Sequence, residues 1–337
     1  MAIAFYTGQD EEYALIDQGT WGGTPATNAA GQGIHIAEWD LKPTVNFLNP
    51  NRAKAQRYNL MTDMTASEKG VVHEIGMPVT PFLKDQGDKF LYAVMQGVSE
   101  GTATPFSKVF TFPQTQPDFS ASSGHFETLV NKMPVASTSH YLNDAIISQL
   151  TLSCSPTAND GMLTAEATWV GRTHVETFNY SGTITYPDAV EGTDFFYFWD
   201  LITKTLSGSA VILGDEGIKL VITNGFQKKG GTGGVPETYA LTYYSCVTTV
   251  NALWDTPLRT QMAYQRAGTA VQLIFEWSTV GEDGNLKFLI NGKWREPRDL
   301  SHARDGEFVT LTHEASGVYG TTEPLTITMT NAIDRAW

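Results

Sequence analysis

The chain has 337 residues, of which 41% are hydrophobic and 17% charged, and its formal net charge is −14 at pH 7. This length exceeds one ordinary domain core and suits two domains of about 150 residues each. The two halves of the chain have the same net charge, because there are 17 acidic and 10 basic residues through Arg172, and 19 acidic and 12 basic residues after it. Since the chain has no basic arm, we do not expect it to bind nucleic acid, because affinity for phosphates comes from Lys and Arg.

The low charged fraction favours a surface that is largely covered by copies of the same chain, since about a quarter of the residues of an ordinary soluble protein are charged. Two cysteines, Cys154 and Cys246, lie in strand-like runs and predict reduced, core-facing thiols rather than a disulfide framework. Neither a secretory signal nor a run of about 18 apolar residues is visible, so we expect cytoplasmic synthesis and no membrane anchor.

Residues 1 to 33 are glycine-rich and keep no period of 2 or 3.6, which predicts an extended arm that is ordered only where it docks. Strand-like patterns then occupy residues 34 to 48 and 70 to 83. The polar segment from Asn49 to Lys69 is too long for an ordinary loop and predicts a hairpin tip that reaches a neighbouring subunit. Its candidate contact residues are Arg52, Lys54, Arg57, Asp63, Glu68 and Lys69.

A first helix is expected from Asp85 to Gln96, with Asp88 as its N-cap and Gly97 as its stop. Alternating apolar and polar residues at 145–153 and 162–170 then predict a hairpin with one buried face.

A second helix is expected from Trp254 to Gln265, with Asp255 or Thr256 as its cap and Pro257 at its first position. A hairpin with similar spacing follows within residues 270–290. Each half therefore carries one helix and a set of alternating strands, which indicates an internal duplication.

We accordingly predict a mainly β protein with sandwich-like or barrel-like domains, each with a flanking α-helix. The predicted units are the arm at 1–33, a first domain at 34–175 that carries the loop 49–69, and a second domain at 176–337.

No catalytic constellation is visible. Ser99 lies in a Gly-x-Ser-x-Gly pattern, but this pattern follows a helix instead of preceding one. The seven histidines lack metal-ligand spacing, and the glycine-rich stretch from Lys228 to Gly234 lacks that of a phosphate-binding loop. The aromatic run Phe195 to Trp199 favours a core or interface segment over a sugar-stacking platform. The sequence therefore predicts no enzyme, no metal and no cofactor.

Five stretches, taken in order, resemble the two-domain tail tube proteins (major tail proteins) of siphophages. The resemblance covers most of residues 34 to 337 and rests on the succession of patterns. The stretches are Pro81–Gly97, Lys108–Phe112, Tyr141–Leu152, Gly161–Gly171 and Pro324–Asn331.

The resemblance implies a tandem duplicated tail-tube fold and a structural virion protein, made in the host cytoplasm, that self-assembles into stacked rings. Such rings form a tube for DNA passage into the host and contact other tail proteins such as the tape measure. A duplicated chain favours a trimeric ring with pseudo-six-fold symmetry, although a hexamer is possible. The acidic balance suits a channel whose walls repel DNA.

Two alternatives stay open at this stage. A carbohydrate-binding tandem β-sandwich would be a stable monomer with exposed aromatic residues on one face. Another tail ring component, such as a baseplate hub or terminator, would form rings that do not polymerise.

Overall fold

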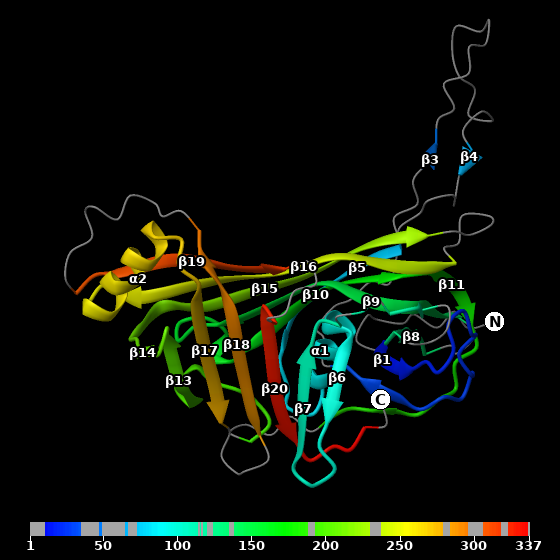
Figure 1. Cartoon of the computed structure of the whole chain (residues 1–337). Helices are drawn as coiled ribbons and strands as arrows, with labels where there is room; N and C mark the ends of the chain where they lie inside the picture. The colour runs from blue at the N-terminus through cyan, green and yellow to red at the C-terminus, as the bar shows by residue number, and fades with distance from the viewer. Residues whose placement is uncertain are drawn as a thin grey trace, which may run out of the picture.

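The computed structural model describes most of the chain. The largest undescribed ranges lie between residues 34 and 73. The described residues are 11–34, 47–48, 65–66, 73–113, 115, 117–119, 124–134, 138–187, 193–229, 237–278, 284–295, 306–317 and 323–335. They form three connected β-sheets, a separate two-stranded sheet and two α-helices, so the predicted mainly β class is confirmed (Figure 1).

Sheet I contains the longest strands of the molecule, and every neighbouring pair in it is antiparallel. Alternation of buried and open residues gives it one core face and one outward face. Its strands, in spatial order, are β5 (His73–Pro81), β10 (Thr164–Gly171), β9 (Ser139–Cys154), β15 (Leu213–Lys229), β16 (Thr238–Leu253) and β19 (Phe308–Gly317).

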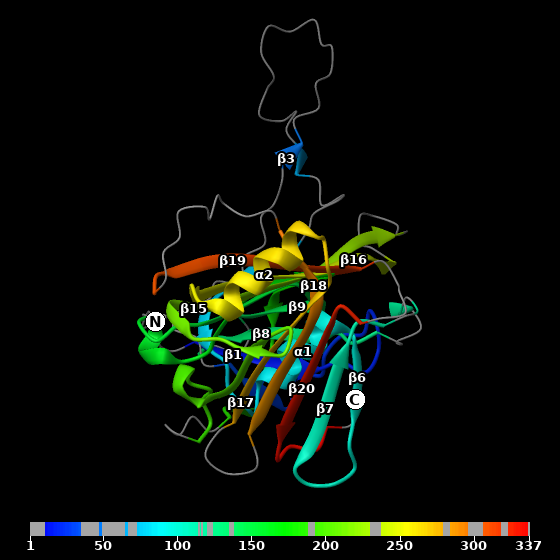
Figure 2. The same ribbon diagram turned by 60° about the vertical axis from the view of Figure 1, so that its left-hand side comes forward.

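Sheet II lies against the core face of sheet I, and its strands cross those of sheet I steeply (Figures 1 and 2). Its strands, in spatial order, are β13 (Leu201–Leu206), β17 (Val271–Ser278), β18 (Asn285–Trp294), β20 (Leu325–Asn331), β7 (Phe106–Thr111) and β6 (Gly97–Glu100), with the short β14 (Ser209–Ala210) beside β13. The end of β18 also pairs with β19 in sheet I, which joins the two sheets at this side.

Sheet III incorporates the described part of the predicted arm. Its strands are β12 (Ile184–Thr185), β2 (Gly31–Gly33), β1 (Glu12–Asp17), β8 (Glu127–Lys132), the first half of β9, and β11 (Thr173–Phe178). In the segment that connects β1 to β2, the Gln18 side chain and the Gly22 amide donate hydrogen bonds to the buried Asp144 carboxylate of β9, at 2.6 Å and 2.8 Å. The arm is thus docked on its own chain, and residues 1–10 lie outside the described residues.

Helix α1 (Gly87–Met95) confirms the first predicted helix, and its contacts with β9, β15 and β7 place it between sheets I and II. Two details of the prediction were wrong. The N-cap is Gln86, while Asp88 lies inside the first turn and is buried. The left-handed residue that ends the helix is Gln96, with φ 67°, and Gly97 already begins β6.

Helix α2 (Thr256–Arg266) confirms the second prediction, including its cap. The Asp255 side chain accepts a hydrogen bond from the Leu258 amide at 3.1 Å, and Pro257 occupies the first turn, where no amide donor is needed. Gln261 fixes the helix to two strands of sheet II, because it donates to the Leu206 carbonyl at the end of β13 and accepts from the Trp294 indole at the end of β18.

The two predicted halves of the chain share their sheets. β9 pairs with β15 in sheet I, and β7 pairs with β20 in sheet II, so each sheet joins strands from both halves. One hydrophobic cluster runs from Tyr13 to Met329. The division at residue 175 and the duplication stay predictions, and the two halves pack as one body.

Both predicted hairpins are present, as β9–β10 and β17–β18. The thiols of Cys154 and Cys246 are free and buried, as predicted. Burial raises the pKa of each thiol to about 12, which keeps both in the unreactive protonated form.

Candidate assembly surfaces

The six charged residues predicted to contact a neighbouring subunit lie outside the described residues. These are Arg52, Lys54, Arg57, Asp63, Glu68 and Lys69. Next to them, β3 (Phe47–Leu48) and β4 (Thr65–Ala66) pair antiparallel, with Phe47 opposite Ala66. This small ladder stands clear of the sandwich (Figure 1). The assignment of these residues to a subunit contact stays a prediction.

Sheet I ends in two strands that have open hydrogen-bonding edges within the described part of the chain. β5 pairs only with β10, and β19 is covered on its outer edge from Thr312 to Glu314, by the end of β18 and the Arg295 amide. Open strand edges are templates for pairing with another chain, and natural proteins normally cover or disguise them. The two edges of sheet I are therefore candidate surfaces for contact between copies.

Large exposed apolar side chains occur on these edges. Val79 on β5 is 55% exposed, and Phe308 at the start of β19 is 49% exposed. Val79 also lies where the register between β5 and β10 shifts, which marks a β-bulge. Exposed apolar groups of this size on edge strands are typical of surfaces that a partner covers.

A second apolar group lies on β13, the edge strand of sheet II. Ile202 is 63% exposed and Ile212 is 55% exposed. The β13–β14 pairing and the bond from the Val211 amide to the Lys204 carbonyl keep the segment that carries Ile212 against β13, the strand that carries Ile202. Phe308 lies next to Gly214, two residues further on, so this group continues into the edge of sheet I.

The aromatic run Phe195 to Trp199 divides between core and surface. Phe196 is fully buried and contacts Phe82, whereas Trp199 is 65% exposed and stacks on Tyr197. The Trp199 ring also lies across Gly161, leaving no room there for a side chain. The run therefore anchors the β9–β10 turn, and one indole remains at the surface.

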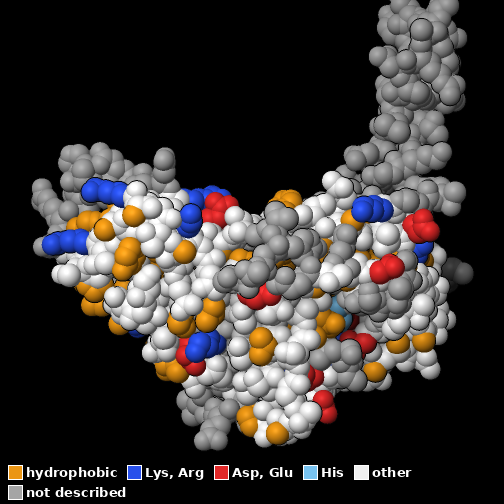
Figure 3. Space-filling model, viewed as in Figure 1, with side chains coloured by type: hydrophobic (Ala, Val, Ile, Leu, Met, Phe, Trp, Pro, Cys, Tyr) orange, Lys and Arg blue, Asp and Glu red, His pale blue; other side chains and the backbone are white. Residues whose placement is uncertain are grey.

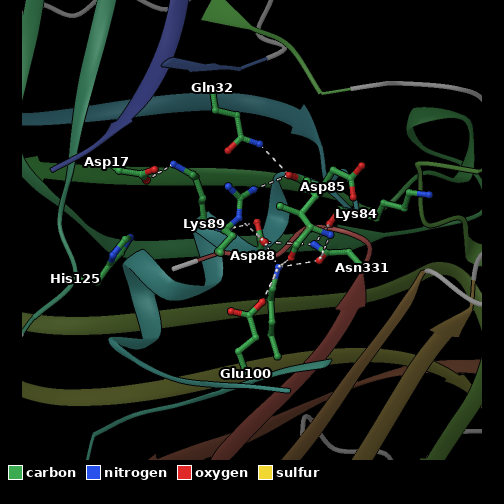
Figure 4. Close-up of polar contacts among 12 residues, drawn as sticks. Asp17, Gln32, Lys84, Asp85, Asp88, Lys89, Glu100, His125 and Asn331 are labelled. Carbon is green, nitrogen blue, oxygen red and sulfur yellow. Dashed lines mark hydrogen bonds and ion pairs between the residues drawn. The ribbon is translucent and has the colours of Figure 1, made fainter. Parts of the chain in front are cut away.

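A buried ionic cluster at the start of α1 joins both ends of the chain (Figure 4). The Asp88 carboxylate accepts hydrogen bonds from the Lys108 ammonium at 2.7 Å and from the Arg335 guanidinium at 2.7 Å. Lys108 also donates to the Asn331 side chain and to the Ile333 carbonyl, each at 2.8 Å. The three N–H donors of the Lys108 ammonium thus have three acceptors, one each from α1, β20 and the C-terminal segment.

The next residue of α1 fastens the N-terminal arm. The Lys89 ammonium forms ion pairs with Asp17 at the end of β1 and with Glu127 on β8. Glu127 is also hydrogen-bonded to His125, whose ring stacks on Tyr92 of α1. The first turn of α1 is therefore the point where β1, β7, β8, β20 and the C-terminal segment meet.

The pKa values of two buried aspartates shift in opposite directions. Burial alone would raise the pKa of Asp88, but Arg335 and Lys108 outweigh it and hold the value below the ordinary range. Burial raises the pKa of Asp144, because the Gly22 amide and Arg172 offset only part of the cost of desolvation. Folding thus shifts Asp88 toward its charged form and Asp144 toward its neutral form.

Sequence reasoning missed this cluster, although one signal was present. In the alternating run around β7, Lys108 falls on the same face as Phe110, which faces the core. A lysine on a core face requires buried partners. Its partners Asp88 and Arg335 lie far away in sequence, so the signal predicts the need for them but not their identity.

The remaining sequence motifs form no site among the described residues. Ser99 lies in the middle of β6, not in a strand-to-helix turn. No group of three His, Cys, Asp or Glu residues that could hold a metal ion occurs in the described ranges. Among the described residues, no helix is long and apolar enough to cross a membrane.

Comparison with protein families gives a match that covers nearly the whole chain. A family model described as phage tail tube protein matches residues 8–328, and thus spans both predicted domains. A search of curated proteins found no matching sequence.

Replacing Asp88 by Asn is expected to lower the free energy of unfolding by about 3 kcal/mol at pH 7, because two buried cations lose their counterion. The effect should depend on pH. Since the folded pKa lies below the unfolded value near 3.8, the stabilisation by Asp88 is complete above that value and is lost as pH falls through the folded pKa. Denaturant titrations should therefore show a constant difference between the two proteins from pH 7 down to about pH 4, and convergence below that, toward about pH 2.

Asp144→Asn is the matched control. The folded pKa of Asp144 is raised, so its charge costs stability as pH rises through that value, and the Asn variant should stay within about 1 kcal/mol of the parent at pH 7. Equal losses from both substitutions would contradict the role assigned to the Asp88 cluster.

Proposed function

The chain belongs to the phage tail tube protein family, and we propose that its copies assemble into stacked rings that form a channel for DNA passage into the host. The family is a structural one, and it places the protein in the virion tail. The observation that carries the proposal is the family match over residues 8–328 together with the open, apolar edges of sheet I.

Strand directions in sheet I suit a closed ring. Each of its strands is antiparallel to its neighbours, from β5 to β19. With an even number of such strands, the two edge strands run in opposite directions. A neighbour related by rotation about the ring axis would bring its β5 antiparallel to the β19 of the first copy. Closure of the ring would satisfy both edges and limit growth within the ring.

Stacking of rings would then use a different surface. We assign it to the segment 49–69, because β3 and β4 pair at its base and stand clear of the sandwich (Figure 1). Heterologous contacts that do not close generate open filaments. The tube would thus combine closed pairing within a ring with open stacking between rings, and its assembly requires no catalysis or cofactor.

Negative-stain electron microscopy of the purified protein, at low and high concentration, tests the proposal directly. We expect hollow rings or tubes with a central channel, and three-fold rings would support the duplication. Monomers under every condition, including after addition of other tail proteins, would count against it. Rings that never stack would favour a baseplate or terminator component, and glycan binding by a stable monomer would favour the carbohydrate-binding alternative.

Lysine at either edge of sheet I should weaken ring formation. Val79→Lys and Phe308→Lys place a charge where the neighbouring copy would bury it, so we expect at least a tenfold rise in the concentration needed for assembly, or about 1.4 kcal/mol. Light scattering after size-exclusion chromatography measures this shift. Both residues are about half exposed in the single chain, so its thermal midpoint should change little.

Gln272→Lys on the open face of β17 is the matched control and should assemble normally. Normal assembly of both edge variants would refute the proposed edge pairing while leaving a tube formed by other surfaces.

Replacing residues 49–69 with a short Gly-Ser turn should leave folded subunits and single rings that no longer stack. The far-ultraviolet circular dichroism spectrum and the melting curve check the fold, and electron microscopy checks stacking. Tubes of normal length from this variant would show that another segment connects the rings.

A further inference from the structure

Four charged side chains, Lys108 among them, meet inside the sandwich, whereas those on the face drawn in Figure 3 are scattered. Lys108, Asp88 and the uncharged Asn331 have no exposed surface. On the neighbouring strand Met329 lies opposite Lys108, and Asn331 follows two residues later on the same face. A primary amine is thus held against a carboxamide, away from bulk water.

The contacts of the Asn331 carboxamide polarise it. Its Oδ1 accepts hydrogen bonds from Lys108 Nζ at 2.8 Å and from the Ile333 amide at 3.2 Å. Its Nδ2 donates to the Lys84 carbonyl at 2.9 Å and to Asp88 Oδ2 at 3.3 Å. Donors on the oxygen stabilise the negative charge that gathers there when a nucleophile adds to the adjoining carbon, Cγ.

Two carboxylates lie beside the Lys108 ammonium, and Figure 4 shows Asp88 and Glu100 pointing toward the same place as Asn331. Asp88 Oδ2 lies 2.7 Å from Nζ, but Arg335 shares this oxygen at 2.7 Å and stabilises the carboxylate charge. Glu100 Oε1 lies 3.6 Å from Nζ, is buried, and has no hydrogen-bond partner among the described residues. We therefore assign the removal of a proton from the ammonium to Glu100.

We propose that Lys108 and Asn331 react in the folded protein and form an isopeptide bond between β7 and β20. Glu100 takes one proton from the ammonium, and the resulting amine adds to Cγ of Asn331. A second proton passes from Nζ to Nδ2 along Asp88 Oδ2, which contacts both nitrogens. The Nζ–Cγ bond forms, the Cγ–Nδ2 bond breaks, and ammonia leaves as an ammonium ion with the proton held by Glu100. The reaction needs no oxidant, reductant or further reactant.

Burial favours this reaction for three reasons. Both groups are held in contact, so the reaction is intramolecular and its effective concentration is high. A buried ammonium is costly, and its conversion into a neutral amide removes a charge from the core, while Asp88 keeps Arg335 as its cation. Bulk water is kept from the carboxamide, so hydrolysis does not compete.

The bond would close a loop between residues that are 223 positions apart. It would tie the strand pair β7–β20, which joins the two predicted halves of the chain, and would restrict the unfolded chain as a disulfide does. All the reacting groups belong to one chain, so the inference does not depend on the assembly of rings.

Peptide mass spectrometry of the wild-type protein tests the proposal. Trypsin does not cleave after an acylated lysine, so we expect a branched peptide that joins residues 90–132 to residues 305–335, and a loss of about 17 Da from the intact chain. Separate peptides alone, cleaved at Lys108 both before and after incubation for several days, would overturn the proposal. A branched peptide that contains residues 85–89 instead would assign the bond to Asp88 and would overturn the choice of Asn331.

Variants separate the chemistry from a general effect on the fold. Samples taken during cell-free synthesis give the rate, and Glu100→Gln, with an unchanged melting curve, should form the bond at least tenfold more slowly. Asp144→Asn alters a buried carboxylate outside the cluster and should react at the wild-type rate. Equal rates in Glu100→Gln and the wild type would overturn the role of Glu100. The denaturant comparison of Asp88→Asn with its parent applies to newly made chains, before the bond forms.

Discussion

The buried ammonium of Lys108 fixes which parts of the chain must come together. Its side chain has no exposed surface, and its acceptors come from α1, the end of β20 and the C-terminal segment. A buried ammonium without acceptors costs several kcal/mol, so docking of the C-terminal segment beside the first turn of α1 stabilises sheet II. Through Lys89, the same turn holds the N-terminal arm.

This cluster explains why the halves of the chain pack as one body. Strands β7 and β20 pair at Lys108, which lies opposite Met329, and β9 and β15 pair on the opposite side of the core. A duplicated chain could have placed its copies side by side with separate cores. Here one core runs through both, so relative motion of the halves would break sheet pairing as well as apolar packing. A rigid subunit of this kind suits a wall that must keep its shape.

Local patterns in the sequence predicted both helices and the hairpins β9–β10 and β17–β18, because alternation and capping act over a few residues. They did not reveal β8, in which Glu127 to Asn131 are all buried and alternation is absent, since both of its faces are covered. The role of Asp88 was also missed. An aspartate before an apolar helix looks like a cap, and only the distant partners Lys108 and Arg335 show that it neutralises buried charge. Pairings that join distant parts of the chain leave no local pattern.

Composition alone was a poor guide to where the charge lies. A net charge of −14 suggests an acidic channel, yet many open positions of the two large sheets are Thr, Ser, Asn and Gln, and Glu276 and Glu314 are paired there with Lys287 and Arg295. Threonine suits these positions for two reasons. Its β-branched side chain favours the strand conformation, and its hydroxyl forms hydrogen bonds with water. Of the large exposed apolar groups, Val79, Ile202 and Phe308 lie on edge strands, whereas Tyr243 lies on the open face of the inner strand β16. The apolar groups on the edge strands are suited to contact between copies.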